Sequence, residues 1–282
     1  MSLPPDCDVF RVPVGPGAVH VERYGYGGPP VVLVHGFGTS AFLWRHVAPA
    51  LAVQGLTAYA LDLLGYGASD RPADADYGIR AQADYLDRAM TALQLPPVCL
   101  AGMDLGAIVA LRLAGDRPER VARLVLVGPP PLEDIVGPGI RDLQRDSARH
   151  ALRLARGLFG AAALLSPFLA GSVEDPRHMP PVLIGRYLAP FVGREGASHL
   201  LALAGAVREE DADDLAVDTV AAPATLLRGT RDRWCTKVVA EAYAELLPSA
   251  RYEPVDAVGR LLPEEAPEVV AHRLAAVATG MA

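Results

Sequence analysis

Short, almost wholly apolar runs recur along the chain, and longer amphipathic stretches separate them. Runs of this kind are typical of strands buried on both faces of a parallel sheet. Gly, Pro or Asp stands near the end of most of them, which favours a turn there. The pattern predicts six such strands, at residues 31–34, 56–64, 97–103, 123–130, 224–230 and 250–256.

Helical periodicity fills most of the intervals between these strands. It is found at residues 43–53, 79–93, 105–114, 237–247 and 265–279. Strands that alternate with helices imply right-handed crossovers and a doubly wound, mostly parallel sheet, so the fold class is α/β. Near the N-terminus, the alternation at 18–27 predicts an antiparallel edge hairpin with its turn at 24–30, and the expected sheet has eight strands.

One interval is too long for a simple crossover. Between the strands expected at 123–130 and 224–230, residues 132–214 have helical patterns broken by Pro and Gly. We interpret this segment as an inserted helical cap. The expected organisation is therefore a core formed by residues 1–131 and 215–282, with the cap at 132–214.

Composition excludes several classes of function. The chain has 282 residues, of which 51% are hydrophobic, and a net charge of −7 without long acidic runs, so we expect neither nucleic acid nor a membrane surface as partner. The N-terminus lacks a basic segment followed by an apolar run, which predicts a cytoplasmic protein. Arg outnumbers Lys, of which Lys237 is the single example, and this indicates a GC-rich, bacterial coding sequence. Cys7, Cys99 and Cys235 lack metal-ligand spacing, so we expect reduced thiols, no metal and no cofactor.

Candidate chemistry lies just after the predicted strands, because ligands of open α/β sheets bind beyond the carboxyl ends of the strands. The glycines of "HGFGTS" at 35–40 allow a bend after which the Phe37 N–H can face a developing oxyanion. The Gly-punctuated "DLLGYGASD" at 62–70 is interpreted as structural support for the rim of a pocket.

An aspartate stands at the apex of a third turn, "GMDLG" at 102–106. Small residues two positions before and two after Asp104 are what a strained strand-to-helix turn needs, and the Leu105 N–H would then face the same point as the Phe37 N–H. Alternatively, Asp104 is only the N-cap of the following helix. A fourth place is "LLRGTRDRWC", where Asp232 follows a buried strand and can orient a base.

The order of these motifs from about residue 14 to the C-terminus resembles the α/β-hydrolase fold superfamily. Because the apex residue is Asp104, the chain is similar to the branch that contains epoxide hydrolases and haloalkane dehalogenases. The resemblance implies that Asp104 is a nucleophile, that the Phe37 and Leu105 N–H groups form the oxyanion site, and that Asp232 orients a histidine. A carboxylate nucleophile should attack saturated carbon, since attack on an ester would give a high-energy anhydride.

The resemblance breaks at the water-activating histidine. The segment "DAVGRLLPEEAPEVV" places Arg260 where the branch has its histidine, and arginine stays protonated in proteins. We expect Arg260 to pair with either Asp232 or Asp104. No other histidine has an evident place beside Asp104, although His150, His178 and His199 belong to the expected cap.

Substrate-side features point to a hydrophobic small molecule. Tyr187 resembles the cap tyrosines that protonate an epoxide oxygen, or it is a packing residue. No tryptophan stands beside Asp104 to hold a halide, and Ile108 and Val109 occupy the region where fluoroacetate-type relatives have an arginine for a small acid. The residues expected to line an apolar, aromatic pocket are Phe37, Trp44, Met103, Tyr187 and Trp234.

Three functions remain open from the sequence. The first is an epoxide-hydrolase-like enzyme whose atypical triad, Asp104, Asp232 and Arg260, limits hydrolysis of the ester. The second is a non-hydrolytic catalyst of cyclisation, isomerisation or rearrangement in a biosynthetic pathway. The third is a ligand-binding pseudoenzyme. In each case we expect a monomer or a homodimer.

Overall fold

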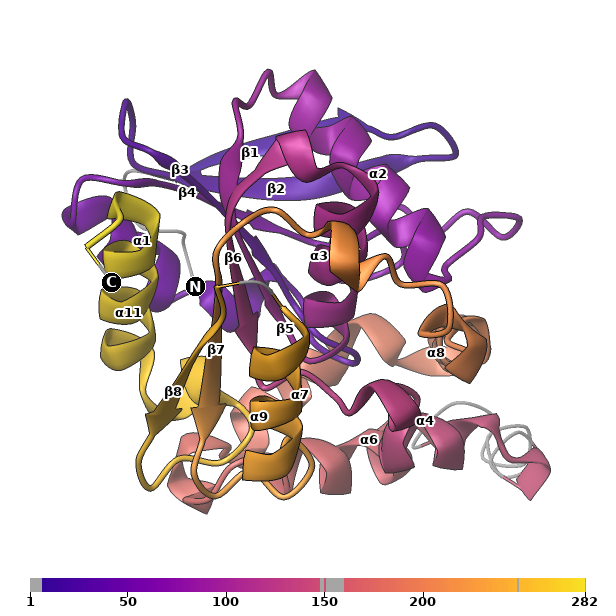
Figure 1. Ribbon diagram of the computed structural model, residues 1–282. Coiled ribbons are helices and arrows are strands. Elements are labelled where there is room, and N and C mark those ends of the chain that lie inside the picture. The colour runs from indigo at the N-terminus through magenta and orange to yellow at the C-terminus, as the bar shows by residue number, and fades with distance from the viewer. Residues whose placement is uncertain (1–6, 148–149, 151–159, 248, 282) are drawn as a thin grey trace.

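A single sheet of eight strands, in the order β1-β2-β4-β3-β5-β6-β7-β8, organises the molecule (Figure 1). The structure is a computed structural model that describes residues 7–147, 150, 160–247 and 249–281. All strands from β4 to β8 in this order are parallel, whereas β2 is antiparallel to both β1 and β4. The strands are β1 (Cys7–Pro13), β2 (Ala18–Tyr24), β3 (Pro30–Val34), β4 (Thr57–Leu61), β5 (Val98–Met103), β6 (Val121–Val127), β7 (Ala224–Gly229) and β8 (Arg251–Val255).

Strands form at all six places predicted from the apolar runs, with boundaries that shift by a few residues; five of them are largely buried, whereas β8 is mostly half-buried or exposed. The predicted edge hairpin is corrected. Residues 18–24 form one strand only, and its hairpin partner is β1, which the sequence did not reveal. The strand β1 is mostly exposed or half-buried, so it lacks the apolar signature of the central strands. It pairs antiparallel with β2 and forms one edge of the sheet.

Helices cover both faces of this sheet. On one side α1 (Val47–Val53) packs with α11 (Pro267–Thr279), and α2 (Ile79–Ala92) packs with α3 (Leu105–Asp116) on the other (Figure 1). Two further core helices are α9 (Lys237–Leu246) and the short α10 (Leu262–Glu265). Because α3 is buried almost all round, it anchors the turn that follows β5.

Four helices of the segment between β6 and β7 lie beyond the carboxyl ends of the strands (Figure 1). They are α4 (Gly137–Gln144), α6 (Gly160–Ala170), α7 (Pro181–Leu188) and α8 (Gly193–Ala206). They contact one another, with α6 against α4, α7 and α8. The cap boundaries at 132 and 214 stay a prediction.

Single-turn 3₁₀ helices occupy several connections: η1 (Ala41–Trp44), η2 (Pro118–Arg120), η3 (Leu132–Asp134), η4 (Pro176–His178), η5 (Ala189–Phe191), η6 (Glu209–Asp211) and η7 (Val217–Thr219). Within the described ranges, none of the helices combines the length and the apolar character that crossing a bilayer requires.

Candidate active site

The turn between β5 and α3 places Asp104 at its apex. Asp104 has φ 53° and ψ −125°, a conformation that costs a non-glycine residue free energy. A Cβ on Gly102 would lie 2.1 Å from the Gly106 carbonyl oxygen, and one on Gly106 would lie 2.3 Å from the His35 carbonyl oxygen. Both flanking glycines are therefore required by close backbone contacts, as the sequence predicted.

Asp104 is 5% exposed, and each of its carboxylate oxygens accepts a hydrogen bond. The Phe37 N–H donates to Oδ2 over 3.0 Å. The Arg260 guanidinium donates to Oδ1 through Nη2. Among the described residues, the carboxylate makes no hydrogen bond to the first turn of α3, so Asp104 does not act as a side-chain N-cap. It is instead a buried anion that faces the turn after β3.

Backbone hydrogen bonds from the cap fix the loop that carries Arg260. The N–H groups of Arg260 and Leu261 both donate to the Ser172 carbonyl oxygen, at 2.9 Å each. The Glu265 carboxylate accepts from the Gly259 N–H at 2.7 Å and from the Glu174 N–H at 2.9 Å. The backbone at Arg260 is therefore held between core and cap.

The guanidinium of Arg260 lies between two aromatic rings. Its central carbon is 3.7 Å from the centroid of the Trp234 ring and 5.6 Å from that of Phe168. Arg260 itself is only 8% exposed. Cation–π contact of this kind stabilises a desolvated guanidinium, so the rings hold the arginine beside Asp104.

Asp232 is the second buried carboxylate, with 5% exposure. Its Oδ1 accepts from the N–H groups of Trp234 at 2.8 Å and Cys235 at 3.1 Å, whereas its buried Oδ2 has no hydrogen-bond partner in the described part of the chain. Burial raises the pKa of Asp232, and the charge of Arg260 offsets only part of that effect. Of the two partners expected for Arg260, the structure selects Asp104.

No described histidine takes the place of the missing base. His35 is fully buried, its Nδ1 faces the Gly36 carbonyl oxygen at 2.8 Å, and its Nε2 accepts from the Leu63 N–H at 3.1 Å. Burial lowers its pKa, so the ring stays neutral. His199 contacts the Gly65 carbonyl oxygen, and His178 lies 4.0 Å from Glu265. His150 is exposed.

The Tyr187 hydroxyl belongs to a hydrogen-bond network with Glu264 and Arg45. The Tyr187 hydroxyl donates to Glu264, whose carboxylate also binds Arg45 through two hydrogen bonds of 2.6 and 2.7 Å. Burial, followed by the charge of Glu264, raises the pKa of Tyr187 well above its usual value. Phe42 lies edge-on to the Tyr187 ring, with 5.6 Å between the centroids. The sequence did not reveal this network, although "PEEAPE" marked the acidic segment.

A cavity of about 410 Å³ opens beside Arg260 and Asp232. Of the aromatic residues expected to line it, only Trp234 does, and Phe168 of α6 is the other ring. Trp44 and Met103 are buried in the core, as are Phe37 and Leu105 next to Asp104. The lining also includes Arg231, Arg233 and Glu174, so the cavity is more polar than the sequence suggested.

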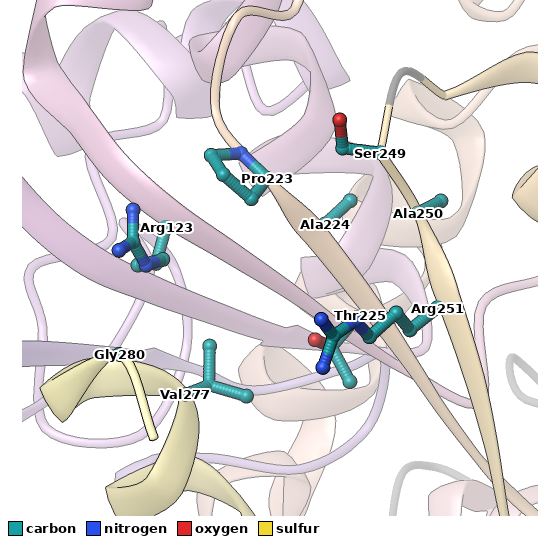
Figure 2. Close-up of a pocket in the computed structure, with 9 residues that line it drawn as sticks. All are labelled: Arg123, Pro223, Ala224, Thr225, Ser249, Ala250, Arg251, Val277 and Gly280. Atoms are coloured by element: carbon teal, nitrogen blue, oxygen red, sulfur yellow. The ribbon is translucent and has the colours of Figure 1, made fainter. Parts of the chain in front are cut away.

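A second cavity, of about 500 Å³, lies at the amino ends of β7 and β8, at the opposite end of the strands from the first cavity (Figure 2). Arg123 of β6 and Arg251 of β8 line it from the two strands that flank β7, and Val277 and Gly280 of the C-terminal segment lie on one side. It contains none of the residues that surround Asp104. Because ligands of such sheets bind at the carboxyl ends of the strands, we place the candidate active site at the first cavity.

Comparison with known proteins agrees with this fold. A family model described as alpha/beta hydrolase fold matches residues 29–267. A haloalkane dehalogenase of Mycobacterium marinum is 34% identical over 174 residues, which make up 61% of this chain and 55% of that relative. The chain thus matches little more than half the length of this curated relative.

Solved structures of similar shape cover nearly the whole chain. The haloalkane dehalogenase DatA from Agrobacterium tumefaciens has a TM-score of 0.81 and 25% identity, with 99% of each chain covered. An epoxide hydrolase, CorEH, has a TM-score of 0.82 over 98% of this chain and 100% of its own. At 22% identity, the second likeness supports the fold alone.

Proposed function

Because the chain belongs to the alpha/beta hydrolase fold family, we propose that it is an enzyme of the aspartate-nucleophile branch. Its Asp104 attacks a saturated carbon of a hydrophobic epoxide or alkyl halide. The similarity to haloalkane dehalogenases supports this branch over the serine esterases. The substrate enters from the cavity beside Arg260, under the cap at residues 132–214, and the protein works in the cytoplasm without a cofactor.

The observation that supports this proposal most is the position of the Asp104 carboxylate. Its Oδ2 accepts the Phe37 N–H at 3.0 Å, so Oδ1, which Arg260 binds in this structure, is the oxygen that attacks once the guanidinium has moved away. When Oδ1 bonds to the substrate carbon, Oδ2 becomes the carbonyl oxygen of an alkyl ester. The Phe37 N–H, joined by the Leu105 N–H at the start of α3, then stabilises the charge that develops on Oδ2 during ester hydrolysis.

Hydrolysis of that ester is the slow step of the proposed reaction. An arginine cannot accept a proton from water, and His35 and His199 contact backbone groups elsewhere. General-base catalysis contributes about 10²- to 10⁴-fold to such a step. We therefore expect the ester on Asp104 to persist for much longer than in relatives with a histidine.

One observation favours a second candidate, a non-hydrolytic catalyst or a binding protein. The Arg260 guanidinium already occupies Oδ1, the oxygen that has to attack. In this alternative the Asp104–Arg260 pair holds and polarises a bound metabolite, and no ester forms.

A burst experiment distinguishes the two candidates. Mixing excess primary aryl-alkyl bromide with the enzyme should release about one equivalent of bromide per protein, followed by slow turnover, as for a covalent intermediate that accumulates. The Asp104→Asn variant should release none. Absence of any burst from the wild-type protein, with binding of the bromide intact, would favour the non-hydrolytic alternative.

A further inference from the structure

Three buried charged groups meet at the site, and their pairing is unequal. Two carboxylates, Asp104 and Asp232, face one guanidinium, that of Arg260. The guanidinium binds Asp104 Oδ1, while Asp232 Oδ2 is buried without a hydrogen bond from the described residues. An unpaired buried carboxylate oxygen is costly. In this arrangement Asp104 is paired with the arginine, and Asp232 Oδ2 lacks a hydrogen-bond donor among the described residues.

The surroundings of Asp232 leave Arg260 as the group best able to satisfy this oxygen. Arg228 also lies close, but its Nη2 donates to the Asp232 and Thr230 backbone oxygens at 3.3 Å, and its Nε donates to the Cys235 backbone oxygen. The charge of Arg260 already lowers the pKa of Asp232, more strongly than that of Arg228 does. Arg260 and Asp232 line the same cavity.

We propose that Arg260 moves between two carboxylate partners and thereby controls the reactivity of Asp104. In the resting form its guanidinium binds Asp104 Oδ1, and in the reactive form it binds Asp232 Oδ2 and leaves Oδ1 free. Asp232 is then a positioning residue that receives the arginine. This inference rests on the proposed function, because it explains how a nucleophile that is already paired becomes available.

The exchange replaces one buried ion pair by another, and we expect the resting form to outnumber the reactive form about tenfold. The loop backbone at Arg260 stays fixed by Ser172, and only the side chain turns. The guanidinium lies over the Trp234 ring, and the Trp234 N–H binds Asp232 Oδ1, so the ring and the second carboxylate come from one turn beside the arginine.

The chemical step then maintains the reactive form. A lone pair of Asp104 Oδ1 forms the bond to the substrate carbon while the electrons of the carbon–halogen or carbon–oxygen bond leave with the halide or alkoxide. The alkoxide takes a proton from water in the cavity. The resulting ester is neutral, so Asp104 no longer attracts Arg260, and the arginine stays with Asp232 until water hydrolyses the ester.

The rate of ester formation tests this exchange. It is measured as the gain in intact-protein mass during incubation with an aryl-alkyl bromide. Removing the guanidinium by Arg260→Met should speed ester formation about tenfold, and Asp232→Asn should slow it about tenfold, because the fraction of molecules with Oδ1 free rises and falls accordingly. The Asp232→Asn/Arg260→Met double variant should react like Arg260→Met alone. Arg251→Gln, in the cavity at the amino ends of β7 and β8, is the control and should match wild type.

A different outcome would overturn the inference. If Asp232→Asn slows ester formation equally with and without Arg260, Asp232 acts in some other way and the exchange does not occur. If none of these proteins forms an ester, the proposed function is wrong. Thermal unfolding of the variants then tests separately whether Arg260 exchanges between the two carboxylates.

The unfolding test uses the neutral variants of both carboxylates. Asp104→Asn and Asp232→Asn should each change Tm by no more than about 3 °C, since Arg260 keeps one partner, whereas the double variant should lose about 10 °C because a buried guanidinium is left alone. Adding Arg260→Met to the double variant should recover most of the loss. Additive effects of the two single variants would contradict the exchange.

Discussion

Phe37 and Asp104 are 67 positions apart in the sequence, yet the Phe37 N–H donates a 3.0 Å hydrogen bond to Asp104 Oδ2. The contact joins the turn after β3 to the turn after β5, which are neighbouring parallel strands. Gly36 makes the approach possible, because a Cβ there would lie 2.5 Å from the same oxygen.

Substituting Gly36 should therefore slow the proposed attack by Asp104. In Gly36→Ala the new methyl group displaces the carboxylate from the Phe37 N–H, and we expect ester formation to slow by about 10²-fold, the effect of losing one oxyanion donor. The rate is measured by intact-protein mass. Gly205→Ala in α8, where a Cβ meets no atom within 4 Å, is the matched control. An unchanged rate in Gly36→Ala would show that this hydrogen bond does not contribute.

Arg260→His should restore the second half-reaction. A histidine at this position can reach the same turn and accept a proton from water, so turnover of an aryl epoxide should rise about 10²- to 10⁴-fold. Arg260→Gln removes the same charge without supplying a base and should not show this gain. A result in which both variants turn over equally would mean that a histidine at this position cannot act as the base.

The sequence predicted those parts of the molecule that follow from local rules. Apolar runs identified the central strands, and the glycines around Asp104 identified a tight strand-to-helix turn because only glycine tolerates the backbone contacts at Gly102 and Gly106. The edge strand β1 was missed, since a half-exposed strand has no continuous apolar run.

Side-chain pairing across the cap could not be predicted in the same way. Arg260 was expected to bind one of two carboxylates, and the choice depends on the rings of Trp234 and Phe168, of which Phe168 lies more than 90 positions away on α6. Tyr187 resembles a proton-donating cap residue in sequence. In the structure its hydroxyl donates to Glu264 of α10. Such contacts depend on tertiary packing, and one sequence carries no signal for them.

Tyr187→Phe tests the role of that hydroxyl directly. Because the hydroxyl donates to Glu264, its loss should lower stability by about 1 kcal/mol, while the rate of epoxide opening changes less than about twofold. Tyr243→Phe, which removes a buried hydroxyl bound to the Pro130 carbonyl oxygen at 2.8 Å, is the control for stability. A loss of epoxide opening of about 10²-fold or more would instead identify Tyr187 as the proton donor.

The pH dependence of stability reports on Asp232. Burial raises the pKa of Asp232 in the folded state, so its ionised form is disfavoured there. In the unfolded chain an aspartate side chain has a pKa of about 3.9. The contribution of Asp232 to stability therefore falls as pH rises from about 4 through the raised pKa, and is constant above it. The asparagine of Asp232→Asn cannot ionise. The free energy of unfolding of the variant minus that of the wild type should therefore be larger at pH 7 than at pH 4. The opposite trend in urea titrations would mean that attraction to Arg260 outweighs burial.

The central claim is that Asp104 is a nucleophile whose ester persists because Arg260 replaces the base. Intact-protein mass spectrometry after incubation with aryl epoxides and alkyl bromides, followed by peptide mapping, tests it most directly. We predict that the wild-type protein gains the mass of one epoxide, or of one alkyl group, on the peptide that contains Asp104, and that Asp104→Asn gains none. An unmodified wild-type protein, with the substrates recovered intact, would contradict the claim.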